Sequence, residues 1–193
     1  MATQKEARRY VGGSWDYTGK KQFEFMLEEG LKPEHKFLDV GCGCFRGGRF
    51  FIEYLNKGNY YGIEKHMWLV EHGMRHEIKN LRHKNYNIIV RDDFNVSPFK
   101  TKFDFGLAKS VFTHLTKKKI KECLIQMYDV MDGPFYASIF VGDSTKNLKD
   151  DNDNKRFFYS IDEIKELAEG WNVKSLSHRG CHHQTMLKFT IKK

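Results

Sequence analysis

Four residues stand at a spacing that suits the binding of a sugar-bearing ligand. Asp39, Gly41 and Gly43 follow a short apolar strand in the segment FLDVGCGCFRGGRFF, and Glu64 ends the next predicted strand. Glycines let a backbone turn tightly and approach a ligand closely. A carboxylate at the end of the second strand can accept hydrogen bonds from both hydroxyls of a ribose. The pattern predicts a ligand that carries a ribose.

The loop itself favours one kind of ribose-bearing cofactor over another. A dinucleotide site uses the pattern G-x-G-x-x-G, whose third glycine would fall at position 46, where this chain has Arg46. Asp39, two residues before the first glycine, is placed to reach a methionyl ammonium directly or through water. These differences favour S-adenosylmethionine over a nicotinamide cofactor, although a glycine-rich turn alone is weak evidence.

The elements around these residues alternate between strands and helices. Apolar runs predict strands over residues 36–40, 59–63, 87–90, 103–108 and 135–141, and helical spacing predicts helices over 20–31, 47–55, 65–83 and 116–131. A capping box of Ser160 and Glu163 opens a further helix, and two strands over 171–177 and 184–192 flank a turn at Arg179-Gly180. We therefore expect an α/β fold: a doubly wound, seven-stranded, mostly parallel sheet with one antiparallel terminal strand, helices on both faces and an N-terminal helical leader.

Length and composition fit one globular domain. The chain has 193 residues, 40% of them hydrophobic and 30% charged, with a net charge of +8. We expect a single domain over 1–193, with a leader helix in 1–31 and the core in 32–193. Four cysteines without a CxxC pair, no apolar run near the roughly 20 residues of a membrane span and no apolar leader predict a cytoplasmic protein with no metal and no membrane contact.

At this point the sequence resembles the class I (Rossmann-like) methyltransferases. Asp39-Val40-Gly41-Cys42-Gly43 matches their first motif, Glu64 the second and Asp93-Phe94 the third, while FDFGLAKSVFTHL over 103–115 is similar to their fourth-strand signature. The resemblance covers roughly residue 32 to residue 193 and implies S-adenosyl-L-methionine as cofactor and S-adenosyl-L-homocysteine as product. The cofactor-binding residues expected on this basis are Asp39, Gly41, Gly43, Arg46, Glu64, Asp92, Asp93, Phe94, Lys109, Tyr10 and Trp15.

Two positions depart from the family pattern. The third glycine that is frequent in the family would fall at position 45, where this chain has Phe45. Gly47 and Gly48 are the nearest residues that could supply the flexibility instead. Before the fifth strand the family often has Lys-Pro-Gly-Gly, and here the chain reads Met131-Asp132-Gly133-Pro134, which changes a turn.

Several residues have both a functional and a structural interpretation. His114 is the candidate general base, because its ordinary pKa suits proton transfer near neutrality, with helix capping as the alternative. Arg46 is a candidate partner of the cofactor carboxylate, with an ion pair as the alternative. Tyr10, Trp15 and Tyr17 lie in a glycine-bearing leader that either covers the cofactor or simply packs. Four lysines over 117–121 open a helix and either attract an acidic substrate or form a solvated face.

The predicted function is methyl transfer from S-adenosylmethionine to an oxygen or nitrogen of a small or medium, anionic molecule. Nucleic acid is a less favoured substrate, because the chain has no Asp/Asn-Pro-Pro-Tyr/Phe segment, no Pro-Cys nucleophile and no separate recognition domain. A non-catalytic S-adenosylmethionine-binding protein is the other alternative. The acceptor and the oligomeric state are left open.

Overall fold

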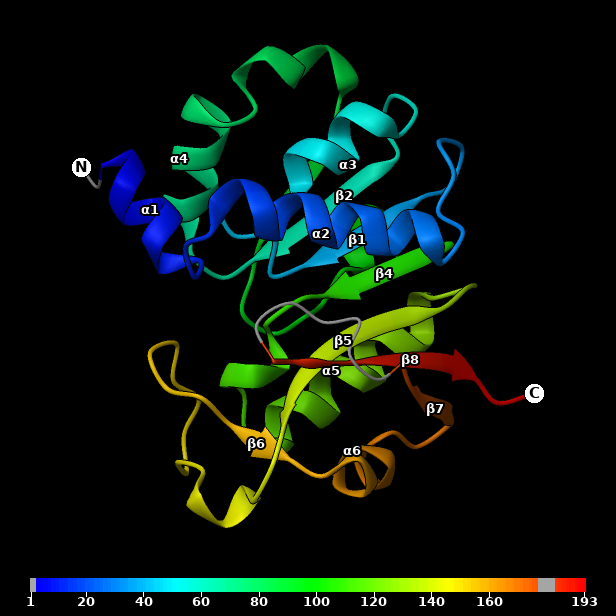
Figure 1. The fold of residues 1–193 in the computed structure, drawn as a ribbon. Helices are drawn as coiled ribbons and strands as arrows, with labels where there is room; N and C mark the ends of the chain where they lie inside the picture. Colours follow the sequence, from blue (N-terminus) through cyan, green and yellow to red (C-terminus); the bar gives the residue numbers. More distant parts are fainter. Residues whose placement is uncertain (1–2, 177–182) are drawn as a thin grey trace. The chain divides into compact units, whose positions relative to one another are not determined.

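The computed structural model describes residues 3–176 and 183–193, which form two compact units, Met1–Asp92 and Asp93–Lys193 (Figure 1). The predicted turn at Arg179-Gly180 lies outside the described residues. So do Cys181 and His182, which together with His183 form a Cys-His-His run. Among the described residues, no helix is long and apolar enough to cross a membrane. The single domain expected over 1–193 stays a prediction.

The first unit contains three parallel strands and the helices that accompany them. Strand β2 lies between β1 and β3, with Asp39 opposite Gly62 and Glu64 opposite Val90. In chain order the elements are α1 (Gln4–Tyr10), α2 (Trp15–Glu28), β1 (Phe37–Val40), α3 (Gly48–Tyr54), β2 (Tyr60–Glu64), α4 (Met67–His76), the 3₁₀ helix η1 (Lys79–Lys84) and β3 (Asn87–Val90). Helix α1 lies beside α4 (Figure 1), and the register brings the carboxyl ends of β1 and β2 together.

The second unit is a mixed sheet with two longer helices. Its strands run in the order β4-β5-β8-β7, β6 pairs with the end of β5, and β8 is antiparallel to both of its neighbours. The elements are η2 (Ser97–Phe99), β4 (Phe105–Ala108), η3 (Phe112–His114), α5 (Lys117–Val130), β5 (Phe135–Val141), η4 (Ser144–Lys146), β6 (Phe158–Tyr159), α6 (Ile161–Leu167), β7 (Trp171–Ser175) and β8 (Thr185–Ile191).

The predicted α/β class, with mainly parallel strands and one antiparallel terminal strand, is confirmed. The predicted helix over 65–83 is divided, because the carbonyl of Gly73 accepts N–H bonds from both Glu77 and Ile78 and so ends α4 before η1 begins. Strand β6 is an addition, since its two residues are too short to show a period of two. The capping box of Ser160 and Glu163 is formed as predicted.

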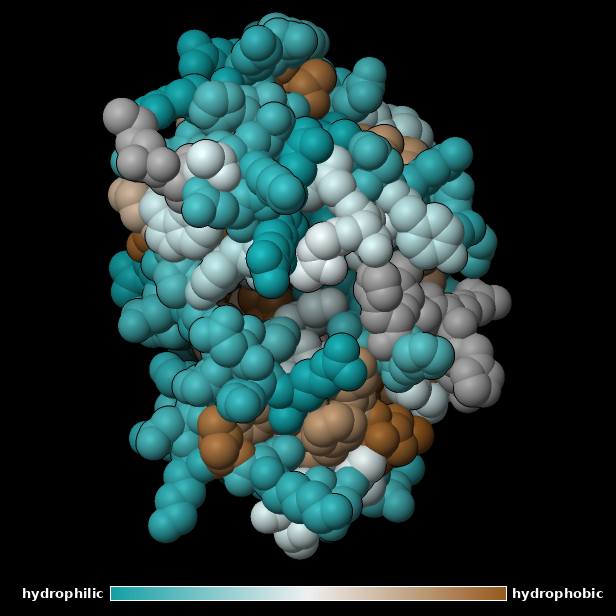
Figure 2. Space-filling view, turned by 60° about the vertical axis from the view of Figure 1, so that its left-hand side comes forward, coloured by the Kyte–Doolittle hydropathy of each residue, from teal (hydrophilic) through white to brown (hydrophobic). Residues whose placement is uncertain are grey.

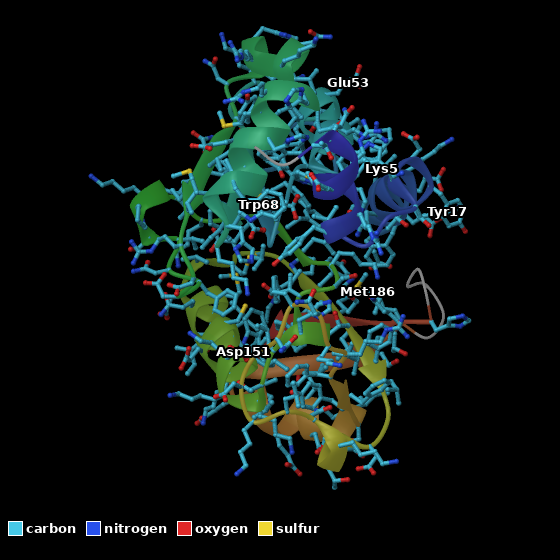
Figure 3. The ribbon with its side chains drawn as sticks, turned by 90° about the vertical axis from the view of Figure 1, so that its left-hand side faces the viewer. Lys5, Tyr17, Glu53, Trp68, Asp151 and Met186 are labelled. Atoms are coloured by element: carbon cyan, nitrogen blue, oxygen red, sulfur yellow. The ribbon has the colours of Figure 1, made fainter. Side chains whose placement is uncertain are left out.

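The surface is mostly polar. The face shown in Figure 2 is mainly hydrophilic, with hydrophobic residues in separate spots. Tyr17 projects outward from α2 (Figure 3), with 64% of its surface exposed. Scattered apolar residues of this kind are ordinary on a protein surface. The cores lie inside each unit, around Phe37 and Phe51 in the first and Phe135 and Phe189 in the second.

Candidate functional site

Asp39 is a buried carboxyl group near the end of β1. Its Oδ2 accepts a 2.7 Å hydrogen bond from the Tyr60 hydroxyl, and only 8% of the residue is exposed. Burial and, to a smaller extent, the charge of Glu64 raise the pKa of Asp39 to about 7, although the Tyr60 hydrogen bond and the Arg46 guanidinium act in the opposite direction. The ionised form of Asp39 has therefore lost much of its solvation by water, and a cationic ligand would compensate for that loss.

Glu64 is a second buried carboxylate, at the end of β2. Its Oε2 accepts the Gly43 N–H at 2.9 Å and its Oε1 accepts the His66 N–H at 3.0 Å. These two bonds join the glycine loop after β1 to the turn after β2. A carboxylate has about four lone-pair positions, so each oxygen of Glu64 keeps the capacity to accept a hydroxyl.

The loop after β1 follows the path that the glycines permit. Gly41 and Gly43 have φ angles of +71° and +56°, in the left-handed region that side chains rarely adopt. A Cβ at Gly43 would lie 2.8 Å from Cγ1 of Val11. Position 43 therefore requires glycine for its conformation and for the close approach of the leader.

Phe45 takes the left-handed conformation that the family's third glycine would take. Its φ is +66°, which costs a residue with a side chain about 1–2 kcal/mol. Its ring is fully buried and fills the space left by another glycine, because a Cβ at Gly73 would lie 2.4 Å from that ring. Burial of the ring offsets the strain, and the loop keeps its path without a third glycine. Gly47 and Gly48 have negative φ, so the flexibility expected there is not used.

Arg46 is directed toward the leader. The guanidinium donates from Nη1 to the carbonyl oxygens of Val11 and Gly13, the latter at 3.3 Å, and the residue is 8% exposed. Arg46 is thus neither a surface residue nor a solvated ion pair. Contact between Arg46 and a cofactor carboxylate stays a prediction.

The two leader aromatics have different environments. The ring of Tyr10 meets His66 and Trp68 edge-on, and the Tyr10 hydroxyl lies 3.0 Å from Nε2 of His66. Trp15 packs in a small core with Ala7 and Cys44, with the Arg8 guanidinium 4.7 Å from its ring centre. Tyr10 therefore lies beside the turn that holds Glu64, and Trp15 lies in the small core; the cofactor contacts predicted for both stay predictions.

The third motif lies where the chain passes from one unit to the other. Asp92 is the last residue of the first unit and Asp93 the first of the second, and both are exposed. Oδ1 of Asp93 accepts the Asn95 N–H at 3.1 Å, and Phe94 has a φ of +57°. The contacts with the cofactor that the resemblance predicts for these residues stay predictions.

Lys109, which directly follows β4, belongs to a cluster of polar side chains that are linked by hydrogen bonds. The Lys109 ammonium donates to Oε1 of Gln184, which also accepts the Ser138 hydroxyl at 2.7 Å. The Ser110 N–H donates to the Ser138 hydroxyl at 2.8 Å. Lys109 was expected in the site on the basis of the family resemblance, whereas Gln184 and the two serines were not, since a lone glutamine before a strand carries no motif.

His114 is held by the backbone of a neighbouring loop. Its Nδ1 lies 2.7 Å from the Lys155 carbonyl oxygen and 3.3 Å from that of Asn152. A carbonyl oxygen only accepts, so Nδ1 carries the proton, and in the neutral ring Nε2 holds the lone pair. This is the tautomer that a base acting at Nε2 requires.

The lysines over 117–121 begin α5, as predicted. Lys117 pairs with Glu163 at 2.7 Å and Lys119 with Glu122 at 2.9 Å, while Lys118 and Lys121 are exposed. Asp151, which is labelled in Figure 3, accepts the Thr116 N–H at 2.6 Å. The charge available to a substrate is thus mainly that of Lys118 and Lys121.

Comparison with solved structures agrees with this arrangement, although no protein-family model matches the chain. Magnesium protoporphyrin IX methyltransferase from Synechocystis, with S-adenosylmethionine bound, superposes with a TM-score of 0.70 at 13% identity, over 96% of this chain and 89% of that one. An S-adenosylmethionine-dependent methyltransferase from Clostridium acetobutylicum gives 0.69 at 10% identity, over 95% and 94%. The glycopeptide N-methyltransferase MtfA, bound to S-adenosylhomocysteine, gives 0.66 at 11% identity, over 92% and 90%. The chain has the fold of the class I S-adenosylmethionine-dependent methyltransferases.

Proposed function

We propose that this protein is a methyltransferase that uses S-adenosyl-L-methionine. One observation carries the proposal: two buried carboxylates, Asp39 and Glu64, end adjacent parallel strands, and the backbone N–H of Gly43 ties the loop of the first to the second. Buried carboxylates are costly unless they meet a positive charge or hydrogen-bond donors. A ligand with an ammonium group and two ribose hydroxyls supplies both.

The residues present fit such a cofactor better than a dinucleotide. The pyrophosphate of a dinucleotide would meet the negative charge of Asp39, whereas the ammonium and sulfonium groups of S-adenosylmethionine are attracted by it. Asp39 would hold the ammonium and Glu64 the ribose hydroxyls. By resemblance to the family, Asp93 would contact the adenine amino group, and Asp92 is the alternative. The other residues that would bind the cofactor are Phe94, Lys109, Tyr10 and Trp15.

The cofactor, when bound, supplies a methyl group on a positive sulfur, and the protein has to align the acceptor and exclude water. His114 would accept the acceptor's proton at Nε2, because Nδ1 is engaged with the Lys155 carbonyl. This role is needed for a hydroxyl acceptor and not for a neutral amine. The pH profile of the rate, compared between the wild type and a His114 variant, would therefore distinguish a hydroxyl acceptor from a neutral amine.

The acceptor is proposed to be a small or medium, anionic molecule. Two of the similar structures are methyltransferases of a porphyrin and of a glycopeptide. The exposed Lys118 and Lys121 would attract an acidic group. Reversing the charge of these two lysines is expected to raise KM for the acceptor and leave cofactor affinity unchanged. An unchanged KM would refute their role.

The proposal is tested by calorimetric titration with S-adenosylmethionine, S-adenosylhomocysteine and NAD. Glu64→Gln removes the charge of the buried carboxylate, and Glu71→Gln is the matched control, since Glu71 is exposed on α4. We expect the first two ligands to bind the wild type and the control, and Glu64→Gln to weaken them about 30-fold or more, as for loss of a buried charged hydrogen bond. Binding of NAD alone, or of no ligand, would refute the proposal.

A further inference from the structure

The turn between α1 and α2 adopts a demanding backbone conformation. Gly12, Gly13 and Ser14 have consecutive φ angles of +96°, +63° and +41°, and Ser14 is not a glycine. A left-handed stretch of this kind persists only where the surroundings hold it. The carbonyl oxygens on this turn, those of Val11 and Gly13, are the ones that receive the Arg46 guanidinium. Arg46 is therefore positioned to stabilise the turn.

The residues before the turn contact both loops that present the buried carboxylates. The side chain of Val11 lies against Gly43, whose N–H donates to Glu64. The hydroxyl of Tyr10 is 3.0 Å from the ring of His66, whose backbone N–H also donates to Glu64. Residues 10–13 thus bridge the loop after β1 and the turn after β2.

Arg46 also belongs to the charged surroundings of Asp39. The titratable and charged groups that act on Asp39 are Tyr60 and Glu64 from β2 and Arg46 from the loop, and the thiol of Cys42 lies near enough to be affected by Asp39. Of these, Arg46 is the cation. Removing its charge makes the ionised form of Asp39 less favourable.

We propose that Arg46 is a positioning residue that fastens residues 10–13 across the two cofactor-binding loops. Through its bonds to the leader, Arg46 links the position of residues 10–13 to the affinity for a cationic ligand. This inference rests on the proposed function for the identity of the ligand, but its leader contact does not.

The experiment compares Arg46→Met and Arg46→Lys with Arg49→Met as the matched control. Arg49 also binds the leader, through Asp16 at 2.6 Å and the face of Trp15, but it is not among the charged groups that act on Asp39. Two quantities are measured for each protein: the dissociation constant of S-adenosylhomocysteine between pH 5.5 and 9, and the rate of tryptic cleavage after Lys5 and Arg9, which are exposed on α1.

The two variants are expected to separate the two roles. For the wild type, affinity should fall as the pH drops below about 7, where Asp39 takes up a proton. Arg46→Met should shift this fall to higher pH, weaken binding at pH 7.5 at least tenfold and speed leader cleavage. Arg46→Lys should keep the wild-type pH midpoint, because it keeps the charge, but should still speed cleavage, because the lysine nitrogen ends one bond short of Nη1, the atom that donates to both carbonyls. Arg49→Met should leave the midpoint unchanged.

Failure of this inference is distinct from failure of the proposed function. A wild type that binds no S-adenosylhomocysteine refutes the proposed function, and cleavage rates then still test the leader contact. A leader that is cleaved no faster in Arg46→Met and Arg46→Lys than in the wild type overturns the inference. Faster cleavage of Arg46→Met with the pH midpoint of the wild type would support the leader contact and show no effect of Arg46 on Asp39. If Arg46→Met does not fold, cleavage of Arg46→Lys at the wild-type rate would by itself decide against the inference.

Discussion

Replacing Asp39 with asparagine should stabilise the ligand-free protein while abolishing cofactor binding. Asparagine keeps the size of the side chain and an oxygen that can accept the Tyr60 hydroxyl, but it carries no charge. The native protein holds Asp39 in a site that disfavours its ionised form, with a pKa of about 7 against an ordinary value of 3.8. Function and stability therefore make opposite demands at this position.

The magnitude follows from the two pKa values. Between pH 3.8 and about 7 the folded protein keeps the Asp39 proton that the unfolded chain has lost, so its stability falls as the pH rises, and it levels off above pH 7. At roughly 1.4 kcal/mol per pH unit, the advantage of Asp39→Asn should grow by about 3 kcal/mol from pH 5 to pH 8. For a chain of this size that corresponds to a Tm difference growing by roughly 6–12 °C.

Thermal or urea denaturation of both proteins at several pH values measures this difference. Groups that titrate equally in both proteins cancel. Asp132→Asn, at an exposed carboxyl, is the matched control for the loss of a carboxylate elsewhere in the chain. A difference in free energy of unfolding that is constant from pH 5 to pH 8, or that shrinks, would refute the reasoning. Binding of S-adenosylhomocysteine should weaken at least 100-fold, about 3 kcal/mol, as for a buried charged contact.

Three further predictions concern packing, the leader and the base. Gly73→Ala should destabilise the protein by about 3 kcal/mol or more in urea denaturation, because its Cβ would lie 2.4 Å from the Phe45 ring and 2.8 Å from the Cys44 carbonyl oxygen; a loss below 1 kcal/mol would show that the loop can shift. Glu77→Gln should free α1 and speed tryptic cleavage after Lys5, because Glu77 accepts hydrogen bonds from Nε and Nη2 of Arg8, both at 2.8 Å. The free energy of unfolding should fall by about 1–3 kcal/mol. Cleavage at the wild-type rate would count against this contact as an anchor of α1. His114→Asn should lower kcat about 10²–10⁴-fold on a hydroxyl acceptor found by screening, with unchanged affinity for S-adenosylhomocysteine. An unchanged kcat would assign His114 to loop packing alone.

The sequence predicted the parts of the fold that rest on local patterns. Apolar runs located β1 to β5, the capping box located the start of α6, and strand alternation located β8. Glu64 lies at the end of its strand as predicted, because a buried strand and a following turn are local signals. Helix α1 was missed, since only Ala7 of its residues is buried and its polar sequence shows no apolar stripe. Its stability comes from the capping box of Thr3 and Glu6 and from the distant Glu77.

The contacts that join distant segments were beyond the sequence. Phe45 read as a departure from the glycine pattern, but its ring occupies space that Gly73 leaves on a helix almost thirty residues later. Gln184 carries no signal until Lys109 and Ser138 are brought beside it. In each case the residue type is explained by a partner that only the folded chain supplies.

Arg46 shows how such partners can alter the interpretation of a motif residue. Next to a cofactor loop, an arginine suggests a bond to an anionic ligand group, and the sequence offered no rival except an ion pair. The structure instead places backbone carbonyls at the guanidinium, on a turn with three left-handed residues. The charge of the guanidinium also acts on Asp39 and lowers the pKa of its carboxyl group. One side chain can therefore hold the leader and favour the charged form of Asp39. The Arg46→Lys variant keeps the positive charge but not the Nη1 hydrogen bonds, and so separates the two effects.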